Sequence, residues 1–473
     1  MAWNSRKPYL DTEDHHPDHR LKRTLGWPHL VALGVGAIVG TGILTLIGVG
    51  ADRAGPAVIL SFAIAGLICA CAALAYAEMA TMIPASGSAY TYTYVVIGQL
   101  VAWIIGWSLI LEYSLVVSAV AVGWSGYATP LLQAWLHFPI TWATAPEIGG
   151  IVNAPAIFII FVVAGLLILG TRESATLNAA LVAVKMVALV VFVTVALPHF
   201  DAANLKPFAP YGFAKAMGPD GVERGVMAAA AIIFFAFYGF DAIATAAEEA
   251  RNPGRDLAIG IVGSMLICVV IYMAVAVTAV GALPFTQFAH TPEPLALVLR
   301  QIDRPVAATY LAASAVIALP TVLLAFLYGQ SRIFFVMARD RLLPIGWAKV
   351  SRRGTPSRIT LITACVVAVI AGLLPIDEIA ALANAGTLAA FAAVSLCMLI
   401  MRVRAPTAER RFRTPAAWPV GLVAIGGCLY LFASLPQKTQ LWFLAWNAAG
   451  LVVYALYGRH GTAPVKPVSD LNA

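Results

Sequence analysis

The stretch GVGAIVGTGI, from Gly34 to Ile43, decides how the rest of this sequence is interpreted. It lies inside the first long apolar segment and contains four glycines: Gly34, Gly36, Gly40 and Gly42. Glycine costs a helix interior about 1 kcal/mol relative to alanine, so an ordinary spanning helix should not collect four so closely. In hydrocarbon, an opened backbone is tolerated only where it lines a cavity or is buried in protein. The stretch therefore predicts a helix that unwinds to hold a small ligand.

Composition places the chain in a membrane. Of its 473 residues, 61% are hydrophobic and 11% are charged, whereas a soluble domain is about half apolar and about a quarter charged. Residues 1–28 are polar and contain no apolar core of a signal peptide. The six cysteines all lie in apolar runs, which indicates neither a disulfide framework nor a zinc site. We expect no metal and no cofactor.

Twelve apolar segments are long enough to cross about 30 Å of hydrocarbon at about 1.5 Å per residue. They run approximately over 29–51, 56–83, 99–130, 151–170, 176–198, 225–249, 258–283, 305–339, 357–375, 378–401, 417–436 and 439–458. The fold class is therefore an all-α membrane protein with twelve transmembrane helices.

Basic residues orient these segments. If the N-terminus is cytoplasmic, the inner segments carry 21 of the 30 lysines and arginines, and the outer loops carry 7. This asymmetry is the positive-inside signal, and it predicts that both termini lie in the cytoplasm. The net charge of +7 thus reflects topology, and we expect no binding of nucleic acid.

The sixth segment contains a second interruption, FFAFYGFDAIATAAEE, from Phe234 to Glu249. Gly239 can open the helix, and Asp241 is suited to cap a second half-helix that begins at Ala242. Segments one to five and six to ten have nearly equal lengths, and an odd number of crossings inverts the second unit. Broken helices at matching positions of two inverted units are the best sequence indication of a transporter's binding site at the membrane midplane.

This pattern divides the chain into six parts. They are an N-terminal tail (1–28), a first five-helix repeat (29–198), an external loop (199–224), a second, inverted repeat (225–401), two additional helices (402–458) and a C-terminal tail (459–473).

Several motifs resemble those of one transporter group. GAIVGTGI is similar to the first-segment consensus of the amino acid–polyamine–organocation superfamily. FFAFYGFDAIATAAEEARNP, YGQSRIFFVMARDRLLP and YAEMATMIPASGSAYTY resemble the sixth segment, the end of the eighth, and the second segment with its inner loop in the cationic amino acid transporter family. The similarity runs from Leu25 to Arg404. It implies a leucine-transporter-type fold of five plus five helices, with helices 1 and 6 broken.

The two breaks suit the two charged groups of an α-amino acid. The half-helix after the first break exposes unpaired N–H groups at its positive end, which favours a carboxylate. We expect the donors to come from Ile38, Val39, Gly40, Thr41 and Gly42. Opened carbonyls around Phe235, Ala236 and Tyr238 would accept the ammonium group. Two alternatives remain: Gly36 and Gly40 as a GxxxG helix-packing face, and a nucleotide-binding loop, for which the spacing and the missing strand are unfavourable.

The resemblance places an aromatic gate over the substrate at Phe235. Phe234, Phe237 and Phe240 lie beside it in the sequence, and periodicity alone cannot separate them. The alternative is an ordinary phenylalanine that faces lipid or the protein core.

Charges inside the spans mark further candidates, because a charge near the membrane centre costs at least about 2.5–3.5 kcal/mol. By resemblance, Lys185 occupies the place of a sodium ion found in coupled relatives, and we expect it to take part in proton coupling. A permanently charged structural role is the alternative. Glu112 matches an acidic position of the family and could carry a proton, or it could be a neutral carboxyl bonded to a neighbouring helix. Glu78, near the inner end of the second segment, is expected to be structural.

Other candidates are less specific. Asp241 is expected to act as a helix cap or, together with Glu248 and Glu249, to belong to an inner gate, with Arg332 as a possible partner. In the family, residues at the depth of Leu319, Pro320 and Thr321 help to set the room for the substrate side chain, and Pro320 departs from the usual pattern.

The sequence thus predicts a secondary-active permease that moves L-amino acids, neutral or of broad range, by alternating access with proton coupling. A polyamine or organocation transporter and an amino acid exchanger are the alternatives. No HExxH or GxSxG motif is present, so an enzyme is not expected. The expected partners are an amino acid, protons and membrane lipid, and the expected location is the bacterial cytoplasmic membrane. The sequence does not indicate a partner subunit.

Overall fold

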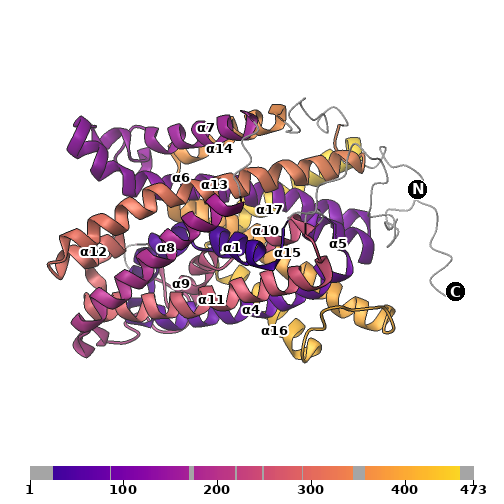
Figure 1. The fold of residues 1–473 in the computed structure, drawn as a ribbon, viewed down its shortest axis with the longest axis horizontal. Coiled ribbons are helices and arrows are strands. Elements are labelled where there is room, and N and C mark those ends of the chain that lie inside the picture. The colour runs from indigo at the N-terminus through magenta and orange to yellow at the C-terminus, as the bar shows by residue number, and fades with distance from the viewer. Residues whose placement is uncertain are drawn as a thin grey trace.

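A computed structural model describes residues 25–458 except 86, 170–174, 219–220, 248–249, 290 and 345–356. Within these ranges the chain is almost entirely helical (Figure 1). Two residue pairs, β1 (Ala216–Met217) and β2 (Glu223–Arg224), form a small antiparallel ribbon.

The first half of the chain contains the helices up to α8. They are α1 (Trp27–Ile38), α2 (Thr41–Leu44), α3 (Leu46–Ala54), α4 (Val58–Met82), α5 (Ser88–Val96), α6 (Gln99–Leu136), α7 (Ala154–Leu169) and α8 (Ala175–Ala196).

The second half contains the remaining helices. They are α9 (Val226–Ile233), the 3-10 turn η7 (Phe234–Ala236), α10 (Asp241–Thr245), α11 (Pro253–Ala282), α12 (Pro294–Gln301), α13 (Pro305–Arg339), α14 (Ser357–Leu373), α15 (Ile376–Arg404), α16 (Ala417–Ser434), α17 (Gln437–Val453) and the π-helical end η11 (Tyr454–Gly458).

Ten helical stretches among the described residues are long and apolar enough to cross a membrane. Two shorter apolar helices, α7 and α14, have 16 and 17 residues. Each predicted segment overlaps helix within the described residues, since a helix satisfies its own backbone groups in lipid.

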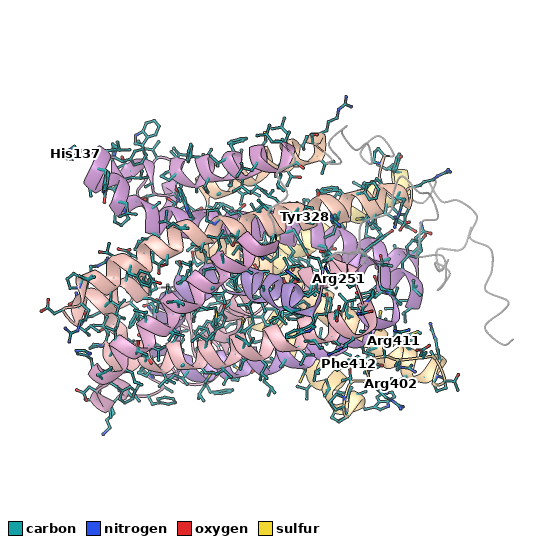
Figure 2. All side chains as sticks on the ribbon, viewed as in Figure 1. His137, Arg251, Tyr328, Arg402, Arg411 and Phe412 are labelled. Atoms are coloured by element: carbon teal, nitrogen blue, oxygen red, sulfur yellow. The ribbon has the colours of Figure 1, made fainter. Side chains whose placement is uncertain are left out.

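Contacts between distant chain segments show which helix ends lie together. At one set of ends, Arg251 bonds to Leu25, Glu78 to Arg402 and Arg404 to Val96. At the other set, Asp201 bonds to Gly281, Asn153 to Gly372 and Lys438 to Glu378. Arg251, Arg402 and Arg411 lie towards one end of the molecule, and His137 lies at the opposite end (Figure 2). This grouping is the one that alternating membrane crossings predict.

The two interrupted helices lie inside the bundle. Figure 1 shows α1 and α10 near its middle, with α7 and α14 along one edge and α16 along the opposite edge. α9 packs against α4, and α1 packs against α11; likewise α6 contacts α15, and α13 contacts α8. Every described residue from Val226 to Thr245 is buried. The interruptions are therefore shielded from lipid, as an opened backbone requires.

Three indole groups attach α17 to α6. Trp107 donates from Nε1 to the Trp446 carbonyl, and Trp446 donates from Nε1 to the Trp107 carbonyl, each at 2.9 Å. Their rings stack with centroids 4.9 Å apart. Trp103 adds a third bond, at 2.8 Å, to the Gly450 carbonyl. We call these three residues the indole clasp.

Glu78 anchors the loop that follows α15. Its side chain is fully buried, and its two carboxylate oxygens accept from Arg402 Nη2 at 2.6 Å and Arg410 Nε at 3.0 Å. The Thr414 backbone N–H donates to the same carboxylate at 2.8 Å. These contacts are consistent with the structural role expected of Glu78.

Candidate functional site

The first helix opens at Val39 and Gly40. α1 ends at Ile38, Gly40 adopts φ −141° and ψ −148°, and helical structure resumes at Thr41. Two tyrosines hold the opened chain: Tyr272 donates to the Ile38 carbonyl at 2.8 Å, and Tyr127 donates to the Leu44 carbonyl at 2.7 Å. The first N–H groups after any helix start have no partner within the helix, so the residues from Thr41 onward present donors at this point.

The sixth apolar segment opens between η7 and α10. Gly239 has φ +119°, a conformation that side-chain-bearing residues rarely adopt. α10 begins at Asp241, one residue earlier than expected, and Phe240 occupies its N-cap position. Asp241 nevertheless compensates for the break, because its Oδ1 accepts from the Gly239 N–H at 3.2 Å. Its Oδ2 accepts from the Tyr113 hydroxyl at 2.9 Å, which ties α6 to α10.

The two breaks touch each other through glycine. A Cβ atom built on Gly42 would lie 2.3 Å from the Cα of Ala236, and one built on Gly239 would lie 2.8 Å from the carbonyl carbon of Ala37. Both obstacles are backbone, which cannot rotate away. The glycines therefore permit a backbone approach that any side chain would prevent.

Gly42→Ala is expected to lower stability by about 1–3 kcal/mol, the usual range for overpacking a well-packed interior. The purified variant should unfold at a lower temperature in detergent than the wild type. Gly426→Ala in α16 is the matched control, because nothing lies within 4 Å of its added methyl group. Equal midpoints for the two variants would contradict the close approach of the breaks.

A small cavity lies between the breaks. Its lining residues come from both interrupted helices and from α6 and α13: Ala37, Ile38, Gly40, Thr41, Gly42, Val116, Val120, Phe235, Tyr238, Val322 and Phe326. The free space is about 10 Å³, about enough for one water molecule. In this conformation the surrounding side chains fill the space, and any molecule larger than water could enter only if they moved.

Two polar atoms at this cavity lack partners. The hydroxyl oxygens of Thr41 and Tyr238 are buried and make no hydrogen bond with any described residue. A buried hydroxyl without a partner costs about 1–3 kcal/mol. A bound polar molecule in the cavity would remove this cost.

Phe235 differs from its aromatic neighbours in position. Its ring meets the Tyr238 ring edge-on, with centroids 4.7 Å apart, and both line the cavity. Phe234 and Phe240 pack on Phe391 instead, and Phe237 packs on Tyr272. The structure thus separates residues that the sequence could not, although the role of Phe235 as a gate stays a prediction.

Lys185 reaches the first break from α8. Its Nζ donates to the Gly36 carbonyl at 2.8 Å and to the Val39 carbonyl at 3.0 Å, and it lies 3.4 Å from Thr321 Oγ1 on α13. The residue is 3% exposed. An ammonium group therefore bridges the opened backbone of one helix and the side chain of another.

Glu112 lies close to the second break. It is fully buried on α6, beside Tyr113, and its carboxyl is close enough to interact electrostatically with Asp241. Neither of its carboxylate oxygens makes a hydrogen bond with any described residue. Gly386 lets α15 approach α6 here, since a Cβ there would lie 3.1 Å from the Glu112 Cβ. Two acidic side chains, Glu112 and Asp241, thus share one buried region.

Some predicted residues lie elsewhere. Leu319, Pro320 and Thr321 do not line the cavity, and α13 continues as a helix through Pro320. Ala236 touches Gly42 and is also absent from the lining. Glu248 and Glu249 lie outside the described residues. The Arg332 guanidinium lies over the Tyr328 ring, 3.9 Å from its centroid.

Sequence reasoning missed five lining residues: Ala37, Val116, Val120, Val322 and Phe326. They carry no local signal, because alanine, valine and phenylalanine are common in every apolar segment. No group of three or more His, Cys, Asp or Glu side chains in the described ranges could hold a metal ion.

Comparison with known proteins agrees with this architecture. The family model of amino acid permeases matches residues 25–456. The chain belongs to the amino acid permease family. The branched-chain amino acid permease BcaP of Bacillus subtilis is 42% identical to this permease over 445 residues, which cover 93% of the permease and 94% of BcaP. The methylthioribose transporter of the same organism is 39% identical over 459 residues, covering 96% of the permease and 97% of that protein.

A more distant group includes the vacuolar cationic amino acid transporter 2 of Arabidopsis thaliana. It is 38% identical over 393 residues, which cover 82% of the permease and 61% of that protein. The family match and these relatives confirm the resemblance to the amino acid–polyamine–organocation superfamily and show that the chain is a multi-pass membrane protein. The names of the relatives point to a transporter rather than an enzyme.

Proposed function

We propose that this permease carries neutral, apolar L-amino acids across the cytoplasmic membrane by proton-coupled alternating access. The observation that carries the proposal is the cavity between the two helix breaks, with unpartnered hydroxyls at Thr41 and Tyr238. Backbone donors of Ile38–Gly42 bind the carboxylate. Carbonyls around Phe235, Ala236 and Tyr238 accept the ammonium group.

Specificity for apolar side chains follows from the remaining lining. Val116 and Val120 from α6 face Val322 and Phe326 from α13, and no charged side chain is among the described lining residues. A lysine or arginine substrate would bury its cation here without a partner, which is costly. A branched aliphatic side chain matches this surface, and the name of BcaP agrees with that assignment.

Alternating access rests on two inverted five-helix units, 29–198 and 225–401, followed by two further helices. The matched packing of α9 on α4 and α1 on α11 supports this repeat, as do the paired breaks. With both termini in the cytoplasm, one unit rocks against the other and exposes the cavity to each side in turn.

Proton coupling involves Lys185 and Glu112. Lys185 donates hydrogen bonds to two carbonyls at the first break, and Glu112 lies near Asp241, which follows the second break. A change of protonation at either residue alters the charge beside a break, which couples the proton to the conformation. Without this link the permease would work as an exchanger or a facilitator.

Uptake of radiolabelled substrates into proteoliposomes tests the function. With an inside-alkaline pH gradient, we expect leucine, isoleucine and valine to accumulate, and lysine, putrescine and methylthioribose to remain at background. Accumulation of methylthioribose alone would indicate a substrate without the amino acid backbone and would refute the carboxylate site. Uptake unaffected by the gradient would refute proton coupling but not amino acid transport.

A further inference from the structure

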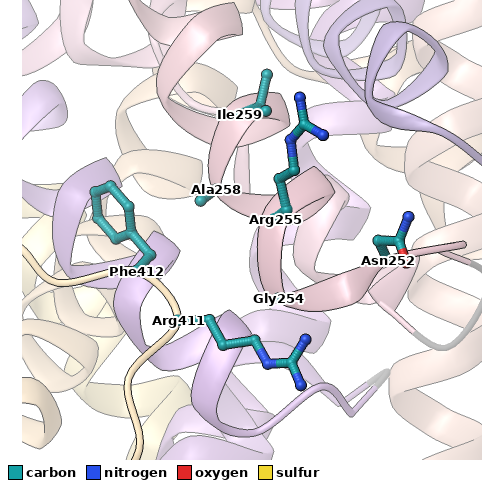
Figure 3. Close-up of a pocket in the computed structure, with 7 residues that line it drawn as sticks. All are labelled: Asn252, Gly254, Arg255, Ala258, Ile259, Arg411 and Phe412. Atoms are coloured by element: carbon teal, nitrogen blue, oxygen red, sulfur yellow. The ribbon is translucent and has the colours of Figure 1, made fainter.

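A second cavity, of about 520 Å³, lies at the start of α11. Its lining residues are Asn252, Gly254, Arg255, Ala258, Ile259, Arg411 and Phe412. Figure 3 shows that these residues come from the beginning of α11 and from the loop between α15 and α16. None of them belongs to the substrate cavity or to the proton-coupling residues, so this pocket has no role in the function proposed above.

The polar part of this pocket is positively charged. Arg255 forms no ion pair with any described residue. Arg411 pairs with Glu409 at 3.6 Å, but the two side chains are 67% and 84% exposed, so solvent screens that pair strongly. Asp256 is buried and does not line the pocket, and its carboxylate accepts from the Asn252 N–H at 3.3 Å. Two guanidinium groups therefore remain available to an anion.

Both arginines lie at the first turn of α11, and their guanidinium groups extend to different sides of it (Figure 3). A Cβ atom on Gly254 would lie 2.0 Å from the Cδ of Arg411, so the arginine stem rests directly on the first turn of α11. Pro253 has no N–H group, and the Gly254 N–H lies at the positive end of a 30-residue helix. The side chain of Asn252 makes no capping bond. These groups make the surface around the first turn of α11 favourable for an anion.

The other part of the pocket is apolar and continues along the membrane face. Ala258, Ile259 and Phe412 line it. Beyond Ile259, the same face of α11 presents Leu266 and Val270, which are 64% and 63% exposed. The spacing from Arg255 through Ile259 and Leu266 to Val270 keeps them on one side of the helix. A basic site that continues into an apolar strip matches a molecule with an anionic head and a hydrocarbon chain.

We propose that this pocket binds the phosphate of an anionic phospholipid, with an acyl chain along the Ile259–Val270 face of α11. Basic pockets between membrane helices on the cytoplasmic side are suited to such headgroups. The assignment to the inner leaflet rests on the orientation in the proposed function. A zwitterionic phospholipid would bring its own cation to the arginines and bind more weakly.

Binding of dioleoyl phosphatidylglycerol to the purified, delipidated full-length permease tests this site by native mass spectrometry. We expect phosphatidylglycerol to bind more tightly than phosphatidylcholine. Arg255→Gln and Arg411→Gln should each weaken phosphatidylglycerol binding about fivefold, the usual contribution of one basic residue near an anionic lipid. Arg413→Gln is the matched control, since it removes an exposed arginine of the same loop that does not line the pocket. It should leave the affinity unchanged.

Three results would overturn the proposal. Equal affinity for phosphatidylcholine would show that binding does not depend on the negative charge of the headgroup. An equal loss in Arg413→Gln would indicate diffuse surface charge instead of a pocket. Displacement of phosphatidylglycerol by millimolar inorganic phosphate would identify the site as one for a soluble anion. Because no transport is measured, failure here is distinct from failure of the proposed amino acid uptake.

Discussion

Lys185→Met is expected to reduce gradient-driven uptake by on the order of a hundredfold. The methionine has a similar reach but cannot donate, so the Gly36 and Val39 carbonyls lose bonds of 2.8 and 3.0 Å. Hydrogen bonds to charged groups contribute about 1.5–3 kcal/mol each, and two such losses correspond to at least a hundredfold change in rate or affinity. Initial rates of leucine uptake across a range of pH provide the measurement.

A counterflow assay separates coupling from a purely structural role. If Lys185 couples the proton, the Lys185→Met protein should still exchange internal for external leucine while it loses accumulation and pH dependence. If Lys185 only holds the broken helix together, both activities should disappear. Uptake with the pH dependence of the wild type would refute any coupling role. Glu112→Gln, assayed in parallel, shows whether the buried carboxyl carries the proton instead.

Glu78→Ala is expected to destabilise the protein by about 3–5 kcal/mol, the usual cost of removing one partner of a buried ion pair. The carboxylate is fully buried and accepts from Arg402, Arg410 and the Thr414 N–H. Without it, the guanidinium of Arg410, whose side chain is 4% exposed, loses its ion pair while still buried. The thermal unfolding midpoint in detergent should fall well below that of the wild type.

Glu409→Gln is the control for this effect. It removes another carboxylate from the same loop, but its ion pair with Arg411 is exposed, and exposed pairs contribute little to stability. Its midpoint should match that of the wild type. A similar fall in both variants would mean that the loop, rather than the buried carboxylate, determines the stability.

The helix breaks could be predicted from sequence because their signals are local. A glycine cluster and a Gly-Phe-Asp triplet oppose a continuous helix wherever they occur, and apolar runs fix the approximate helix positions. The family resemblance was confirmed by the family match. The exact start of α10 differed by one residue, because the backbone at Phe240 is already helical.

The four glycines of the opening stretch could not be distinguished in the same way. Gly34 faces Ser264, Gly36 faces Val182 and Gly42 faces Ala236, whereas a Cβ on Gly40 would meet the nearest side chain at an ordinary 3.6 Å. Each contact depends on a residue more than a hundred positions away. Gly34, Gly36 and Gly42 thus serve close packing, while Gly40 lies in the opened segment itself. The GxxxG packing face considered for Gly36 and Gly40 therefore holds for Gly36 alone.

The side-chain surface of the cavity was equally inaccessible to sequence reasoning. Which face of α6 or α13 points inward depends on how each helix is rotated within the bundle. Leu319–Thr321 and Val322 are neighbours in sequence, yet of these Val322 alone reaches the cavity. A difference of one residue turns a helical side chain by about 100°, which periodicity in an all-apolar helix cannot resolve.

The indole clasp binds α17 to α6, the helix on which Val116 and Val120 lie. Any tilt of α6 must take α17 with it, since three indole bonds would otherwise break in an environment without water to replace them. α17 presents Leu441, Trp442 and Leu444 outward, each about 60% exposed. If α6 moves during transport, we expect that movement to reach the boundary with the bilayer, so that the thickness and stiffness of the lipid would alter the rate of transport.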